Sequence, residues 1–276
     1  MKKYLFEKEI RLFSIKRSGS SAIVSFLLGH YLPQEIVYLH NTDFSFRTRN
    51  RGINPFEFYS IMEGCNPDDF KCFLNTTEHN YPKQGSFEVI HEKMRDRNYV
   101  YHVDKMWYAN YAGYGSGRFS EQVYNIILLR SPHNNLASIL RILEVGKGFQ
   151  KHIFHNFTED WLMYARECMD ETNYIPDKVI CLFDKWFESE EYRKEFSSNL
   201  GLNYCEDGIH NVIRNVGSSF DGFRYEKTAQ EMKVNDRWEY YTEHPEYLKK
   251  LKNDELIERA KVLFNIDIRS IFEGKL

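Results

Sequence analysis

Short runs of branched and aromatic residues alternate with longer amphipathic segments over most of the chain. The short runs are typical of buried strands and occupy residues 10–15, 35–39, 98–103, 123–129 and 178–183. Apolar residues recur at helical spacing in segments at 20–31, 132–143, 157–169, 184–200 and 248–264. This alternation predicts an α/β fold, a three-layer sandwich in which helices flank a central, mostly parallel sheet.

Residues 41–95 interrupt the alternation. The region is rich in Asn, Asp, Gly and Pro and has weak periodicity, which predicts loops and short helices. Long irregular insertions in compact domains often form binding surfaces, so we expect this one on the substrate side. The rest of the chain shows no linker, low-complexity tract or internal repeat, so residues 1–276 are expected to form one domain.

Composition limits the classes of partner. A net charge of −3 over 276 residues gives no basic field for nucleic acid or an anionic membrane, so an anion site must be local. Five scattered cysteines without a CxxC pair indicate neither a zinc ribbon nor a disulfide framework, and no metal is expected. The sequence suggests neither a signal peptide nor a membrane span, and reduced thiols fit a cytoplasmic protein.

The first candidate site is a polar loop between the strand at 10–15 and the helix at 20–31. Backbone N–H groups and the dipole at a helix N-terminus favour an anion there. A glycine allows close approach of the backbone, serine hydroxyls donate hydrogen bonds, and a guanidinium suits phosphate or sulfate oxygens. The loop consists of Lys16, Arg17, Ser18, Gly19, Ser20 and Ser21. The alternative is a helix capped by Ser18 or Ser20, with Arg17 in solvent.

The second candidate site follows the strand at 123–129. Arg130 stands at the carboxyl end of that strand, and Pro132 suits the first turn of a helix. Ser138 lies eight residues beyond Arg130, so the guanidinium and the hydroxyl could bind one phosphate from two sides. Taken alone, this pattern favours a strand-end arginine and a surface serine.

Together, the two sites resemble those of the sulfotransferases that use 3′-phosphoadenosine-5′-phosphosulfate (PAPS). The sequence RSGSS at 17–21 is similar to the family's first loop, which holds the 5′-phosphosulfate. RSP at 130–132, followed by Ser138, is similar to the second motif, which holds the 3′-phosphate. The resemblance extends over 11–31 and 98–264. It implies a P-loop-like fold, PAPS as the donor and 3′-phosphoadenosine-5′-phosphate (PAP) as the product.

Later stretches add to the resemblance. VICLFDKWFESEEYRKEFSSNLGL at 179–202 resembles a strand, acidic turn and helix of the family. A further segment resembles the "SSF … RW" region that helps to close the nucleotide site, and its matching residues are Ser218, Ser219, Phe220, Arg237 and Trp238. Two positions depart from the pattern. Arg17 stands where many members have Lys, and a guanidinium donates a proton far less readily. Ser131 stands where Asp is usual.

Transfer of a sulfuryl group to a hydroxyl or amine also needs a general base. The resemblance implies His102 as the first candidate, because cytosolic sulfotransferases have a catalytic histidine at a comparable strand end. Asp104 is the rival, since the VDKM stretch also resembles an acidic motif of other branches. Lys105 would then bind the sulfuryl group or the acceptor. We expect the acceptor to be a carbohydrate or another small molecule.

Two alternatives remain open. A divergent P-loop kinase would need a loop lysine and an acidic magnesium ligand such as Asp184, but the loop lacks the Walker A pattern, although Lys16 is adjacent. A non-catalytic nucleotide- or glycan-binding protein on the same fold would bind without transfer. A hydrolase with a nucleophile elbow is disfavoured, because no G-x-S-x-G sequence occurs.

Overall fold

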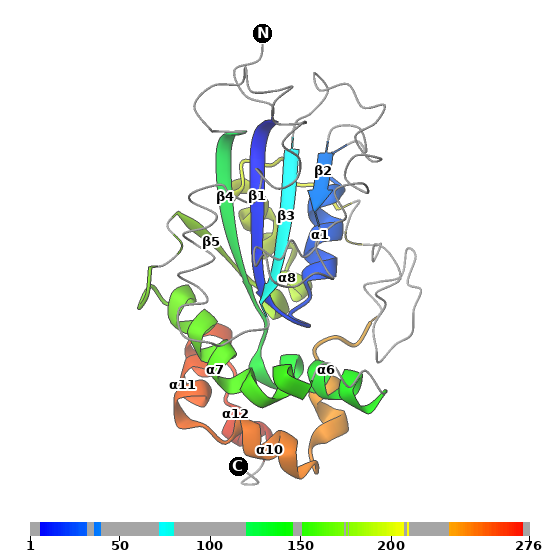
Figure 1. Ribbon diagram of the computed structural model, residues 1–276, viewed down its shortest axis with the longest axis vertical. Coiled ribbons are helices and arrows are strands. Elements are labelled where there is room, and N and C mark those ends of the chain that lie inside the picture. The colour runs from blue at the N-terminus through cyan, green and yellow to red at the C-terminus, as the bar shows by residue number, and fades with distance from the viewer. Residues whose placement is uncertain are drawn as a thin grey trace.

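The computed structural model describes residues 6–31, 36–39, 72–79, 120–145, 151–173, 175, 177–206, 209 and 232–272. A sheet lies at the centre of this part of the chain (Figure 1). Its strands, in spatial order, are β2 (Ile36–Leu39), β3 (Cys72–His79), β1 (Phe6–Ile15), β4 (Ser120–Leu129) and β5 (Lys178–Leu182). Each neighbouring pair is parallel, which confirms the predicted α/β class.

The helices follow the strands in the order that the sequence pattern predicts. They are α1 (Ser20–Leu28), α6 (Pro132–Glu144), α7 (Lys151–Cys168), α8 (Phe183–Glu188), α9 (Glu190–Asn199), the 3₁₀ helix η5 (Arg237–Tyr241), α10 (Pro245–Leu251), α11 (Asp254–Phe264) and α12 (Ile268–Ile271). No helix in the described ranges is both long enough and apolar enough to span a membrane.

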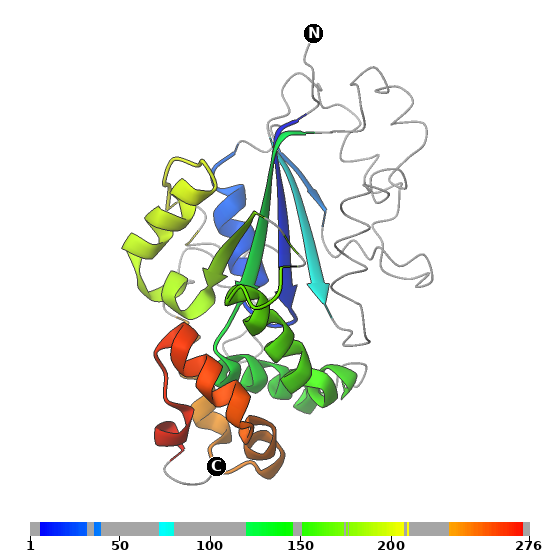
Figure 2. The same ribbon diagram turned by 90° about the vertical axis from the view of Figure 1, so that its left-hand side faces the viewer.

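Alternate side chains of β1 face two different layers of helices. Ile10 and Leu12 belong to an apolar cluster with residues of α1, α8 and α9. Phe13 and Ile15 belong to a second cluster, which includes the buried residues of α7. Figure 2 shows α1, α8 and α9 together on one side of the sheet. Helices therefore flank the sheet on both faces, as predicted.

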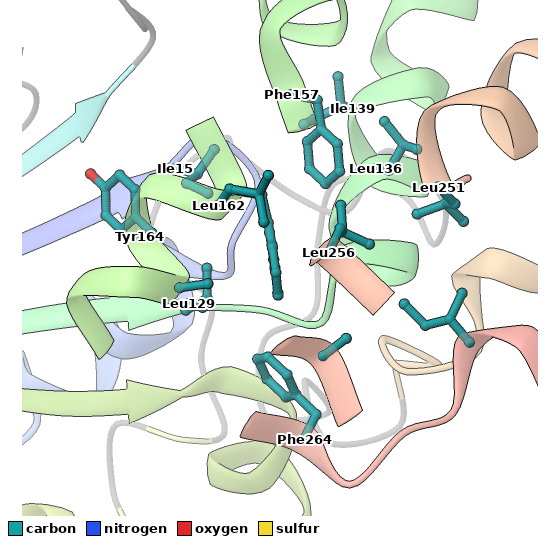
Figure 3. Packing of buried hydrophobic residues seen from close by; sticks show 14 of the residues in the cluster. Ile15, Leu129, Leu136, Ile139, Phe157, Leu162, Tyr164, Leu251, Leu256 and Phe264 are labelled. Atoms are coloured by element: carbon teal, nitrogen blue, oxygen red, sulfur yellow. The ribbon is translucent and has the colours of Figure 1, made fainter. Parts of the chain in front are cut away.

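The second cluster also joins the C-terminal helices to the sheet. In Figure 1, α6, α10 and α12 lie beyond the carboxyl ends of the strands. Ile15 and Leu129, at the ends of β1 and β4, share this cluster with Leu136, Phe157 and Leu256 from three helices (Figure 3). The end of the sheet that carries both sequence motifs is thus held by a continuous apolar core.

β3 corrects the prediction for residues 41–95, which contained no strand. The sequence CFLNTTEH has too few apolar residues for a period-two signal, although threonine and phenylalanine favour strands. β3 nevertheless pairs with β1 over its whole length and with β2 on its other side. Backbone pairing on both sides therefore compensates for the weak local pattern. The strand predicted at 98–103 lies outside the described residues.

Two predicted helices are each divided by a polar cap. The segment at 184–200 is interrupted at Ser189, whose hydroxyl accepts a hydrogen bond from the Tyr192 N–H at 3.1 Å. The segment at 248–264 is interrupted before Asn253, whose side chain accepts from the Leu256 N–H at 2.9 Å. Apolar residues keep helical spacing across both breaks, so periodicity alone did not reveal them.

Candidate functional site

The two sequence motifs meet at the carboxyl end of the sheet. β1 ends at Ile15 and the neighbouring β4 ends at Leu129. In their parallel register Ser14 pairs with Leu128, so Lys16 and Arg130 leave the sheet side by side. Open α/β sheets bind ligands at this edge. The two motifs are far apart in the sequence, but they lie close together in space because β1 and β4 are neighbouring strands.

The loop after β1 has a tight and unusual backbone. Arg17 has a φ of 67° and Gly19 a φ of 96°, both in the left-handed region. The Ser18 N–H donates to the Ile15 carbonyl at 3.2 Å and closes the turn. Gly19 is the N-cap residue of α1, so the alternative in which Ser18 or Ser20 caps the helix is wrong.

The Ser18 side chain is a buried polar group in this loop. It is completely buried, and its hydroxyl makes no hydrogen bond with any described residue. Buried hydroxyls in proteins are almost always hydrogen-bonded, to protein, water or ligand. The hydroxyl of Ser18 is therefore suited to an oxygen-rich ligand at this loop.

Gly19 is also required by its contact with Phe183, the first residue of α8. A Cβ atom built on Gly19 would overlap with three carbons of the Phe183 ring. The same ring lies 5.3 Å from the guanidinium carbon of Arg130. Phe183 thus contacts both motifs and fixes the distance at which the loop approaches Arg130.

Arg130 is the buried centre of a group of arginines. It is 1% exposed, and its Nη1 donates to the Ser138 hydroxyl at 3.0 Å and to the Arg17 carbonyl at 3.4 Å. Its Nη2 donates to the Val234 carbonyl. Arg237, also buried, donates to the same Ser138 hydroxyl at 3.1 Å. One fully buried hydroxyl is therefore shared by two guanidiniums from distant segments.

Positive charge is concentrated at this site. Burial, and after it the charges of Arg237 and Arg17, lower the pKa of Arg130 to about 9, while Asp184 acts in the opposite direction. Arg130 remains charged at neutral pH. Several guanidiniums gathered around one buried hydroxyl make this part of the sheet edge suited to an anion.

Asp184 connects α8 to the start of α6. Its carboxylate accepts two hydrogen bonds from Ser131, one from the backbone N–H at 2.8 Å and one from the hydroxyl at 2.5 Å. Both groups are buried. The serine at 131, where the sulfotransferase pattern has aspartate, explains how this contact is possible: a second carboxylate would repel Asp184.

The first turn of α6 also holds two other segments. The side-chain amide of Asn134 donates to the Asn235 carbonyl at 2.8 Å, just before η5. That of Asn135 donates to the Lys16 carbonyl at 3.0 Å. Sequence reasoning did not single out these asparagines. The feature of the sequence that could have identified them is the pair of amide side chains in the first turn of a helix beside a candidate phosphate motif.

The structure brings together part of the predicted site. Arg17, Gly19, Arg130, Ser138 and Arg237 converge as described above, and Lys16, Ser20 and Ser21 belong to the same loop and helix start. Trp238 instead packs edge-on against His133 and Phe272. The remaining predicted residues lie outside the described part of the chain: His102, Asp104, Lys105, Ser218, Ser219 and Phe220.

His79 is a further residue that the sequence did not assign. It is the last residue of β3, and its Cα pairs with that of Ile15 in β1. The His79 backbone therefore lies at the strand end next to the loop at 16–21. Sequence reasoning assigned no role to His79, because the resemblance to the sulfotransferases does not extend over residues 41–95.

Comparisons with known proteins give a structural match but no sequence match. No model of a protein family and no curated protein matches the chain. A solved structure, the sulfotransferase domain from the Synechococcus PCC 7002 olefin synthase, superposes with a TM-score of 0.55 at 13% sequence identity. The alignment covers 95% of this chain and 96% of that domain. The chain thus has a sulfotransferase-like fold.

Proposed function

We propose that this chain is a sulfotransferase that moves a sulfuryl group from PAPS to a hydroxyl or amine of a carbohydrate or other small molecule. The observation that carries the proposal is the convergence of Arg130 and Arg237 on the buried hydroxyl of Ser138, beside the loop at Arg17. Guanidiniums held this close together attract anions, and they match the oxygens of a phosphate or sulfate group. A nucleotide with phosphates at both ends of its ribose would suit the site.

Each end of the nucleotide has its own set of residues in this proposal. The loop at 16–21 would hold the 5′-phosphosulfate through backbone N–H groups, the Ser18 hydroxyl and the Arg17 guanidinium. Arg130 and Ser138 would hold the 3′-phosphate, with Arg237 closing the site from the other side. The predicted contribution of Ser218, Ser219, Phe220 and Trp238 belongs to the same proposal.

PAPS would supply an activated sulfuryl group, whose S–O bond to the bridging oxygen breaks as the acceptor attacks in line. Arg17 and the N-terminus of α1 would stabilise the negative charge that develops on that oxygen. Because a guanidinium is a poor acid, Arg17 would act by charge and hydrogen bonding rather than by proton donation. The positive charge that magnesium supplies in kinases would come from arginines here.

Three residues are candidates for the general base in this proposal. His102 and Asp104 remain the candidates from the sequence, with Lys105 as a binding residue. His79 joins them, because its backbone lies at the end of the strand that pairs with β1. His79→Ala, His102→Ala and Asp104→Asn separate the three. The base variant should lose turnover by a factor of about 10² or more while its affinity for PAP is unchanged.

The kinase alternative is disfavoured by the contacts of Asp184. Both of its carboxylate oxygens accept hydrogen bonds from Ser131 inside the protein. These bonds account for the burial of Asp184 without a magnesium ion, and the loop lacks the Walker A pattern of kinases. The alternative of a non-catalytic binding protein is separated from the proposal only by a transfer assay.

The first test is thermal unfolding with PAP, ADP or ATP–magnesium. A ligand that binds only the folded state raises its stability, so we expect PAP alone to raise the unfolding temperature markedly. Ser138→Ala should reduce the shift with PAP and leave any small effect of ADP unchanged. A shift with ATP–magnesium alone would overturn the proposal. Release of PAP from PAPS with a panel of acceptors then distinguishes an enzyme from a binding protein.

A further inference from the structure

Asn135 lies between Arg130 and Ser138 of the second motif, at a position that the motif does not specify, and it contacts the loop at 16–21. It is completely buried in the first turn of α6. Its side-chain amide donates to the Lys16 carbonyl at 3.0 Å. The side-chain oxygen Oδ1 of Asn135 makes no hydrogen bond with a described residue. The bond to Lys16 is therefore the one hydrogen bond of this side chain within the described part of the chain.

The bond acts on a strained part of the loop. Because the peptide group is planar and trans, the Lys16 carbonyl and the Arg17 N–H point in opposite directions. Asn135 holds the carbonyl, and so fixes the orientation of the peptide that leads into Arg17, whose φ is 67°. A non-glycine residue in this region costs free energy and persists only where its surroundings hold it.

The neighbouring carbonyls are held as well. The Ile15 carbonyl accepts from the Ser18 N–H, and the Arg17 carbonyl accepts from Arg130 at 3.4 Å. The Arg130 contact is long for a hydrogen bond, whereas the Asn135 contact has ordinary length. Among the described contacts, the one from Asn135 in α6 therefore holds the loop more firmly than the one from Arg130.

We propose that Asn135 is a positioning residue, which holds the loop at Lys16 and Arg17 in the conformation that binds the 5′ group of the nucleotide. The inference rests on the proposed function, because it assigns the loop to the 5′ end and Arg130 with Ser138 to the 3′ end. The inference predicts different effects on the two phosphates. Loss of the Asn135 amide should weaken recognition of the 5′-phosphate and spare recognition of the 3′-phosphate.

The experiment compares the affinities of PAP and of adenosine 3′-monophosphate, which lacks the 5′-phosphate, by titration calorimetry. In Asn135→Leu, which keeps a buried side chain of similar size, Kd for PAP should rise roughly fivefold or more. Kd for the 3′-monophosphate should stay unchanged. Should this variant fail to fold, Asn135→Ser, whose hydroxyl is too short to reach Lys16, gives the same comparison.

Ser197→Ala is the matched control. Ser197 is also completely buried and donates to the Arg193 carbonyl at 2.9 Å, but it lies in α9, whose hydrogen bonds do not involve the loop. In Ser197→Ala, the ratio of Kd for PAP to Kd for adenosine 3′-monophosphate should equal that of the wild type. Equal weakening of both ligands in Asn135→Leu, or no weakening of PAP, would overturn the inference. If the wild type itself does not prefer PAP, the proposed function fails instead.

Discussion

Residue 19 combines a left-handed backbone with direct contact to an aromatic ring. Gly19 has a φ of 96°, and a Cβ there would overlap with Phe183. We expect Gly19→Ala to lower the free energy of unfolding by about 2–4 kcal/mol, because backbone strain and overpacking act together. Denaturation of the variant and the wild type in urea measures this loss.

Phe183→Leu separates the two causes. If the ring contact is important, the double variant with Gly19→Ala should lose less stability than the sum of the two single losses. A strictly additive result would contradict the contact and leave the backbone conformation as the sole cause. If the contact is important, nucleotide affinity should also fall in Gly19→Ala, since the loop would have to move away from the Phe183 ring.

Asp160 in α7 is a buried acid outside the candidate site. It is 2% exposed, and neither carboxylate oxygen bonds to a described residue. Burial, with a contribution from Glu159, raises its pKa to about 7. Since the folded-state pKa lies above the unfolded one, ionisation of Asp160 adds no penalty below about pH 4 and destabilises the fold increasingly as the pH rises toward 7.

Asp160→Asn removes this titration. Relative to the wild type, its free energy of unfolding should increase by about 2–3 kcal/mol between pH 5 and pH 7.5. Comparing the two pH values cancels the constant cost of burying an amide. Glu159→Gln is the exposed control and should show little change. An equal difference between Asp160→Asn and wild type at both pH values would contradict the prediction.

At the scale of elements, the start of α6 is the point where several segments are joined. Ser131 donates two hydrogen bonds to Asp184 of α8, while Asn134 and Asn135 hold the segment before η5 and the anion loop. The start of α6 is thus fixed by side chains of its own first turn. A change in this turn should therefore affect stability and binding together.

Ser131→Asp tests the link to α8. It introduces the aspartate that is usual in the similar sulfotransferase motif and places a carboxylate against Asp184. We expect a loss of about 2–4 kcal/mol at pH 8, smaller at pH 5, where one of the two acids can hold a proton. Ser131→Ala should lose about 1–2 kcal/mol at both pH values. Equal stability of the two variants at pH 8 would contradict the repulsion.

Several elements were predictable from the sequence and others were not, for local reasons. β4 and α6 were predicted to within a few residues, because VYNIILL is a continuous apolar run and Pro132 marks the helix start. β3 was missed because its sequence is polar, and it is a strand through pairing with β1 and β2. The breaks at Ser189 and Asn253 depend on single capping bonds that leave the apolar spacing intact.

At the scale of the molecule, the site depends on the order of strands. The sequence suggested an anion loop at Arg17 and a phosphate motif at Arg130, but it does not specify that β1 and β4 are neighbours. That adjacency is a long-range property of the sheet. The shared contact of Arg130 and Arg237 with Ser138 depends on the return of the C-terminal segment to α6, which local patterns cannot reveal.

The C-terminal helices and the sheet should unfold as one unit. Leu256 of α11 is completely buried in the cluster that contains Ile15 and Leu129 at the strand ends. We propose, as the sequence predicted, that the chain is one domain. Calorimetry should then show a single transition, and Leu256→Ala should move all of it to lower temperature with a loss of about 2–5 kcal/mol.

Ligand binding provides the decisive comparison for this prediction. Arg237 reaches Ser138 from the C-terminal segment, whereas Arg17 belongs to the loop after β1. If both parts fold cooperatively, PAP should raise the whole transition in the wild type and in Leu256→Ala by similar amounts, since the binding residues are unchanged. Two transitions, of which Leu256→Ala lowers only one, would contradict the single domain, because the helices would then unfold without the sheet.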